Sequence, residues 1–348
     1  MKLDQSDLKR AVMQGIITPA QAEQLWEMVR QRSGGRPRFD TAHVAWYFGA
    51  LIIIGAMGWF MTEAFASYGG SGLLIVATVY GIAFWLTGKT LWTQPLLRIP
   101  GGLLVTCAVC MVPLAVYGLQ RMTGWWPDGA TASYRGLHRW MRAEGLWLEL
   151  ATIAAGLLAL RCVRFPFLVA PVAVALWYLS MDLVALLAPD GPVRWELRPW
   201  VSFWWGLAML MVAWLVDRRT ERDYAFWLYL FGMVAFWGGL TFLESNTQLS
   251  AFVYFVINLM LVALSVVLQR RVFIVFGIVG VFGYLAWLAH EVFADSLLFP
   301  VVLTLAGVVI IYAGVQWQRH EAAIAATFER RFPQLVAALV PPRRRTGA

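Results

Sequence analysis

Carboxylates inside apolar sequence are the side chains of this chain best placed to do chemistry. They stand near the ends of long hydrophobic runs, and the set is Glu63, Glu149, Asp182, Glu244, Glu291 and Asp295, with His290 beside Glu291. A carboxylate at the edge of a hydrocarbon layer is costly, and it typically binds cations or relays protons. The pattern predicts an outward-facing acidic site, with Asp182 and Glu149 as its deepest members. The alternative is that most of these groups are solvated at headgroup depth or paired with loop arginines such as Arg194 and Arg198.

Other reactive residue types form no catalytic or metal-binding pattern. The chain has four histidines, and His290-Glu291 lacks the second histidine of a zinc motif because position 294 is alanine. Cys107 and Cys110 share one helical face, but no basic neighbour is present to activate a thiol, so a packing role is expected. We therefore expect no enzyme activity, no metal and no cofactor.

The elements that must position the carboxylates are apolar runs. The chain is 60% hydrophobic and only 14% charged, and a run of about 17–25 apolar residues spans a bilayer core. Ten such runs follow one another: 42–65, 73–92, 99–119, 146–163, 165–188, 199–216, 224–243, 249–268, 272–293 and 297–317. The expected fold is an all-α polytopic membrane protein with about ten transmembrane helices.

Arginine placement predicts the orientation of these helices. If the N-terminus is cytoplasmic, most of the 28 lysines and arginines lie on the cytoplasmic side, as the positive-inside rule requires. The opposite side keeps only Arg121, Arg135, Arg139, Arg142, Arg194 and Arg198. Both termini are therefore expected in the cytoplasm, and the net charge of +8 reflects membrane topology rather than a nucleic-acid partner.

A repeated sequence pattern suggests that the helices form serial hairpins, all inserted into the membrane in the same direction. Trp59 and Glu63 recur as Trp287 and Glu291, and Thr78, Gly81 and Gly88 recur in the following run as Thr304, Gly307 and Gly314. Chance similarity in tryptophan-rich apolar sequence is the alternative.

The expected domains are a cytoplasmic helical hairpin over residues 1–35, a linker over 36–41 and a transmembrane domain over 42–317. Gly15 is placed to end the first helix of the hairpin, and Thr18 with Gln21 forms a capping box for the second. The hairpin is expected to pack on itself or on the membrane face, or else to dock a protein partner or a second copy of the chain.

Two further segments are expected to contact membrane lipids. The outer loop 120–145 carries tryptophans among Arg135, His138, Arg139 and Arg142, which is typical of an interfacial helix. Such a loop anchors the protein or covers an anionic ligand. Residues 318–348 form a cytoplasmic amphipathic helix and a basic tail, in which Arg343, Arg344 and Arg345 contact anionic headgroups.

The segments LKRAVMQGIITPAQAEQLWEMV and HVAWYFGALIIIGAMGWFMTEAF carry a family resemblance. They resemble a large bacterial family of multi-pass membrane proteins known only as a domain of unknown function. The resemblance is clearest over residues 8–92 and implies a bacterial inner membrane, a cytoplasmic helical hairpin and serial apolar hairpins. Relatives often have an Asn-Trp pair where this chain has Thr62-Glu63, so a role for that pair does not transfer here.

Two function classes fit these patterns, ahead of a membrane-embedded enzyme. One is a transporter or carrier that uses the outer carboxylates. The other is a non-catalytic scaffold, or an envelope-stress or assembly factor, that acts through the cytoplasmic hairpin. A transporter needs the deep carboxylates to converge, whereas a scaffold does not.

The predicted topology has a direct test. A reporter that is active only in the cytoplasm, fused after Ala348, should be active because an even number of spans returns the chain to its starting side. Activity of a periplasm-specific reporter at the same position would contradict the ten-span arrangement.

Overall fold

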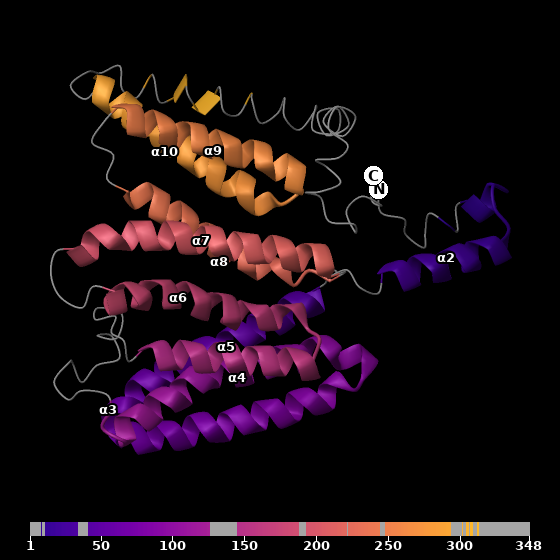
Figure 1. Cartoon of the computed structure of the whole chain (residues 1–348). Helices are drawn as coiled ribbons and strands as arrows, with labels where there is room; N and C mark the ends of the chain where they lie inside the picture. Colours follow the sequence, from indigo (N-terminus) through magenta and orange to yellow (C-terminus); the bar gives the residue numbers. More distant parts are fainter. Residues whose placement is uncertain are drawn as a thin grey trace. The chain divides into compact units, whose positions relative to one another are not determined.

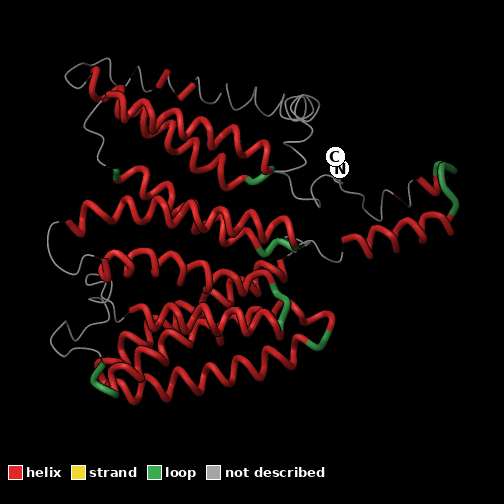
Figure 2. The backbone as a smooth tube through the Cα atoms, in the orientation of Figure 1, coloured by secondary structure: helices red, strands yellow, loops and turns green. Residues whose placement is uncertain are grey.

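Helices make up nearly all of the described chain, and none of the described residues lies in a strand. The computed structural model describes residues 8, 11–33, 41–125, 145–187, 193–220, 222–243, 248–293, 301, 304, 305, 307, 308 and 312. Figures 1 and 2 show the helices in order: α2 (Pro19–Ser33), α3 (Thr41–Trp92), α4 (Arg98–Met122), α5 (Leu146–Cys162), α6 (Val169–Leu187), α7 (Val193–Arg219), α8 (Ala225–Phe242), α9 (Gln248–Leu268) and α10 (Arg271–Phe293). Short 3₁₀ turns, η1 (Pro95–Leu97) and η4 (Pro166–Leu168), precede α4 and α6. The all-α prediction is confirmed.

Within the described part of the chain, six helical segments are long and apolar enough to cross a membrane: Gly69–Trp92, Pro95–Met122, Pro166–Val184, Glu196–Arg219, Ala225–Phe242 and Arg271–Leu288. Shorter apolar segments occupy Val44–Met57 and Leu249–Ser265, and α5 has 17 residues. The first nine expected runs thus coincide with helix, while most of the tenth lies outside the described residues. These helices fit an integral membrane protein.

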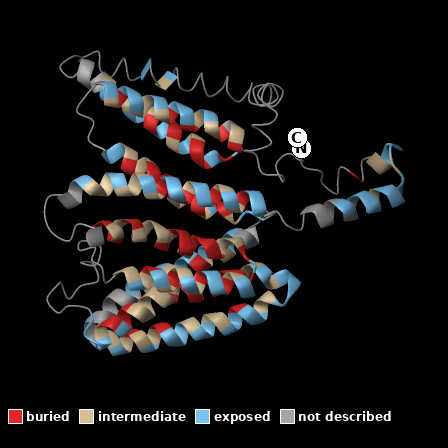
Figure 3. Cartoon of the chain, in the orientation of Figure 1, coloured by how far each residue is buried: buried red, intermediate tan, exposed pale blue. Residues whose placement is uncertain are grey.

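Side-chain burial agrees with that environment. Many large apolar side chains point away from the packed interior, including Phe48, Ile75, Leu158, Met260 and Val275, each more than half exposed (Figure 3). Exposed apolar surface along several helices would be unfavourable in water but suits contact with lipid chains.

The chain divides into two compact units, Met1–Gly49 and Ala50–Ala348. In the first unit the expected turn forms as the sequence indicates. Gly15 adopts a left-handed φ of 69°, and the Ile16 N–H donates to the Ala11 carbonyl at 2.9 Å, which is the Schellman arrangement. The Thr18 N–H donates to Gln21 Oε1 at 2.9 Å and the Gln21 N–H to Thr18 Oγ1 at 3.3 Å, completing the capping box.

Helix α3 contains two of the expected spans, which meet at Gly69. This glycine has φ 65° and ψ −164°, a conformation outside the helical region. Residues with a Cβ rarely adopt it, so glycine is what lets the chain bend sharply between the two apolar runs. The part of α3 after Gly69 packs on α4 through Leu73, Ala77 and Tyr117.

Glycines bring the helices of consecutive hairpins into close backbone contact. A Cβ at Gly88 of α3 would lie 2.9 Å from the Gly101 carbonyl oxygen of α4, and one at Gly118 of α4 would lie 2.7 Å from the Leu74 nitrogen of α3. In α7 and α8, Gly206 and Gly239 meet the facing backbone in the same way. Small residues at such crossings let van der Waals packing join helices in an apolar medium.

The main apolar core surrounds α8. Tyr229, Met233 and Phe236 of α8 are buried together with Ala213 of α7, Ala173 of α6 and, from α9 and α10, Leu261, Leu268, Val272 and Phe273. The rings of Tyr229 and Phe273 meet edge to face with centroids 5.6 Å apart. Helix α8 therefore joins the α9–α10 hairpin to α6 and α7.

Buried Asn258 of α9 is a polar residue that lies beside this core. Its Oδ1 accepts a hydrogen bond from Trp237 Nε1 of α8 at 3.1 Å, and its Nδ2 donates to the Tyr254 carbonyl at 2.8 Å. Gly280 of α10 packs so closely on the Asn258 amide that any side chain there would overlap it. One amide thus orients three helices.

Adjacent glycines of α8 provide a matched test of the close crossings. A Cβ at Gly239 would lie 2.5 Å from the Phe203 nitrogen and 2.6 Å from the Pro199 oxygen, whereas one at Gly238 meets nothing within 4 Å among the described residues. Gly239→Ala should lower the stability of the detergent-purified protein by about 1–3 kcal/mol, the usual cost of overpacking. Gly238→Ala should be neutral or slightly stabilising. Equal effects in thermal unfolding would contradict this packing.

Candidate functional site

The two deepest predicted carboxylates come from the antiparallel hairpin of α5 and α6. Glu149 lies in the first turn of α5, thirteen residues before that helix ends at Cys162. Asp182 lies thirteen residues after α6 begins at Val169. With a rise of about 1.5 Å per residue, both groups sit about 20 Å from the turn that joins the helices. Equal spacing therefore places them at the same depth.

The structure brings the two carboxyl groups together. Their charges lie close enough to interact, and both residues are buried, with Glu149 8% and Asp182 5% exposed. Two carboxyl groups can form a hydrogen bond with each other only if they hold a proton, because a carboxylate has no donor. Without a proton or another cation, two carboxylates in contact repel each other strongly.

One oxygen of the Glu149 carboxyl group could accept a further hydrogen bond. Its Oε2 atom is buried and has no hydrogen-bond partner among the described residues. The Tyr178 side chain, one turn before Asp182 on α6, lies within electrostatic reach of Glu149. A buried, unsatisfied carboxyl oxygen is unfavourable unless it serves another state of the protein. The pair can therefore take up a proton, or a small cation, and release it.

Gly145 leaves the space that Asp182 fills. It precedes α5, and a Cβ at this residue would overlap Oδ2 of Asp182. The Asp182 carboxyl group thus lies against the N-terminus of α5, where free backbone N–H groups and the helix dipole favour negative charge. This location offsets part of the cost of burying the group.

The other predicted site residues lie wholly or partly outside the described part of the chain. Glu63, His290 and Glu291 fall on the helical backbones of α3 and α10, but their side chains are not among those described. Wholly outside lie Glu244, Asp295, Arg135, His138, Arg139, Arg142, Arg343, Arg344 and Arg345. Their roles stay predictions.

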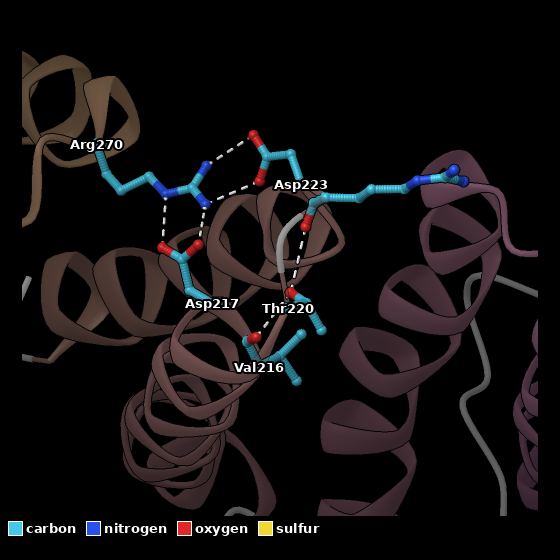
Figure 4. Close-up of polar contacts among 6 residues, drawn as sticks. Val216, Asp217, Thr220, Asp223 and Arg270 are labelled. Carbon is cyan, nitrogen blue, oxygen red and sulfur yellow. Dashed lines mark hydrogen bonds and ion pairs between the residues drawn. The ribbon is translucent and has the colours of Figure 1, made fainter. Parts of the chain in front are cut away.

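A second polar cluster was not expected from the sequence. Arg270 lies between α9 and α10, and Figure 4 shows its guanidinium between the carboxylates of Asp217 and Asp223. Its Nε and Nη2 donate to Asp217 at 3.1 and 2.6 Å, and its Nη1 and Nη2 donate to Asp223 at 2.9 and 2.8 Å. The guanidinium carbon also lies 5.1 Å from the centre of the Tyr229 ring.

Charge compensation keeps Arg270 ionised. Burial disfavours its charged form, but the hydrogen bonds and charges of Asp223 and Asp217 outweigh that effect, so the pKa of Arg270 lies above its ordinary value. Arg270 is 4% and Asp217 1% exposed, whereas Asp223 is 48% exposed. The cluster therefore carries two carboxylates for one cation.

Neighbouring residues fix the turn that carries Asp223. Thr220 Oγ1 donates to the Val216 carbonyl at 2.8 Å and to the Arg222 carbonyl at 3.2 Å (Figure 4). The Arg222 guanidinium donates to the Arg164 carbonyl, in the turn between α5 and α6, at 2.9 Å. The α7–α8 turn is thereby tied to both neighbouring hairpins.

Comparisons with family models, with curated proteins and with solved structures find no match for this chain. What the carboxyl pair does is therefore inferred from its own chemistry.

A double-mutant cycle tests the contact between Gly145 and Asp182. Gly145→Ala should lower thermal stability by about 1–3 kcal/mol, because its methyl group displaces a buried carboxyl. In an Asp182→Ala background the same change should cost little, since the overlapping atoms are gone. If Gly145→Ala cost the same in both backgrounds, the Asp182 carboxyl would not occupy this space.

Proposed function

We propose that this chain is a multi-pass membrane transporter or carrier for a small solute, with Glu149 and Asp182 as its proton-binding site. The observation that supports this is the pair of neighbouring, buried carboxyl groups between two apolar helices. Ionisable groups within membrane helices typically mark proton relays and ion pathways. A single proton shared by two carboxyls is easily exchanged when the surroundings change, which suits a coupling site.

The proposed topology has ten spans with both termini in the cytoplasm, in a bacterial inner membrane. Its support is the arginine distribution and the resemblance of residues 8–92 to bacterial membrane proteins. In this orientation α5 begins, and α6 ends, on the outer side. The carboxyl pair then opens outward, where the remaining acidic residues of the predicted site would attract cations.

Each carboxyl has a distinct role in this proposal. Asp182, held at the N-terminus of α5, keeps the negative charge most readily. Glu149, with its free Oε2 acceptor, takes the exchanged proton. Uptake of the proton reduces the charge of the pair from −2 to −1, and its release restores a charge that a cationic group of the solute, or the next proton, can balance.

A membrane scaffold is the second candidate, and the N-terminal hairpin supports it. Met13 and Ile16 at its turn are 79% and 69% exposed, and Met28 in the second half of α2 is 60% exposed. Exposed apolar residues on a small helical unit are typical of a surface that docks on a protein or on a membrane.

Proton movement in liposomes distinguishes the two candidates. The purified protein is reconstituted with a pH-sensitive dye inside the vesicles, and a panel of amino acids, sugars, nucleosides and organic ions is added one at a time. At least one solute should change the internal pH. Glu149→Gln and Asp182→Asn should reduce that change to the level of protein-free liposomes, because neither variant can share a proton in the same way.

Glu196→Gln is the matched control, since Glu196 is an exposed carboxylate in the first turn of α7. It should leave the solute-driven signal unchanged. A signal that survives in both pair variants would contradict the proposed proton site. A parent protein that moves neither solute nor protons across the whole panel would favour the scaffold.

A further inference from the structure

The α9–α10 hairpin is attached to the rest of its unit mainly through α8. The apolar part of this attachment involves Leu261, Leu268, Val272 and Phe273 against Tyr229 and its neighbours. Polar contacts accompany it: the hydrogen bonds between Asn258 and Trp237 and between Thr241 and Tyr254 along the helices, and the Arg270 cluster at the turn. Among these, the Arg270 cluster is the one that involves charged groups.

The buried Arg270 cluster adds little net stability to this attachment. Removing a guanidinium and a carboxylate from water costs about as much as their attraction returns, so a buried ion pair adds little net stability compared with apolar residues. Arg270 nevertheless lies 4% exposed with Asp217 at 1%. Such a contact is better explained by specificity, or by two alternative states, than by stability.

Asp223 is the solvent-exposed member of the cluster. It is 48% exposed and lies in the short turn after α7, whereas Asp217 is on the last turns of α7 itself. Water can reach Asp223 without disturbing the core, so its contacts with Arg270 can break first. The remaining Arg270–Asp217 pair then becomes more accessible to solvent.

The backbone places Arg270 directly after the end of α9. Gln269 adopts a left-handed φ of 52°, and the Arg270 N–H donates to the Ser265 carbonyl at 3.2 Å. This backbone bond closes the C-terminus of the helix. The Arg270 side chain starts from a fixed point beside α7.

We propose that Arg270, Asp217 and Asp223 form a releasable latch that holds the α9–α10 hairpin against α7 and α8 at the turn end. Breaking the Asp223 contacts lets this end of the hairpin separate from α8 while the Asn258–Trp237 contact remains. The latch goes beyond the proposed proton site and does not rest on it, because it involves different helices and different residues.

Cysteine accessibility measures the release. Ser265 is buried and lies on the same face of α9 as Leu261 and Leu268, four residues after one and three before the other. Ser265→Cys is introduced in a background in which Cys107, Cys110 and Cys162 are replaced. The purified protein in detergent is then reacted with a water-soluble maleimide. Slow labelling of the parent, well below its unfolding temperature, should become about fivefold faster with Asp223→Ala, as expected for loss of a partly exposed charged hydrogen bond.

Two controls separate a latch from general loosening. Ala159→Cys on α5 is also buried but lies outside the attachment of α9–α10, so Asp223→Ala should not change its labelling. Asp223→Glu keeps the charge and should restore slow labelling of Ser265→Cys. The proposal is overturned if Asp223→Ala leaves the labelling rate of Ser265→Cys unchanged, since the contact is then not what holds the hairpin. Equal acceleration at both sites would overturn it as well.

Discussion

The structure depends on one constraint: the apolar surroundings of the helices offer no hydrogen-bond partners. Every polar group within the helices must then be satisfied by the chain itself. Asn258 receives the Trp237 indole N–H, and the Trp205 indole of α7 donates to the Leu176 carbonyl of α6 at 2.8 Å. Glu149 is paired with Asp182, and Arg270 with two aspartates. Each of these contacts joins different helices, so polar groups orient a bundle whose cohesion comes from apolar packing.

Close packing explains where these polar contacts can form. Glycines at the crossings of α3 with α4, and of α7 with α8, let the helical backbones touch, and short side chains can then reach across. The same principle applies at the carboxyl pair, where Gly145 accommodates Asp182. A proton at the carboxyl pair, or water at Asp223, would alter one of these few buried polar contacts.

The helical content of the fold could be predicted from the sequence, because apolar run length and turn residues are local signals. The capping box of Thr18 and Gln21 follows from such a signal. Glu149 and Asp182 could be selected because each stands alone in apolar sequence, and their equal spacing from the hairpin turn explains why they meet.

Arg270 could not be selected in this way. Arginines and aspartates near helix ends are expected in any membrane topology, and no local pattern links Arg270 with Asp217, 53 residues earlier. Gly283 of α10 meets no neighbour within 4 Å among the described residues, although it lies only three residues after Gly280, which packs on Asn258. Long-range pairing and the exact register of packed helices are decided by tertiary contacts, which the sequence pattern does not contain.

The central claim is that Glu149 and Asp182 share one proton inside the bundle. Infrared difference spectroscopy of the purified protein at neutral pH observes this directly, because only a protonated carboxyl group gives a carboxylic-acid carbonyl band. Two difference spectra are recorded, one between the parent protein and Glu149→Gln and one between the parent and Asp182→Asn. Each should show one such band that is present in the parent and lost in the variant. The difference spectrum between the parent and Glu196→Gln should show no such band. If the parent lacks the band, or if it survives in both pair variants, the two carboxyl groups do not share a proton.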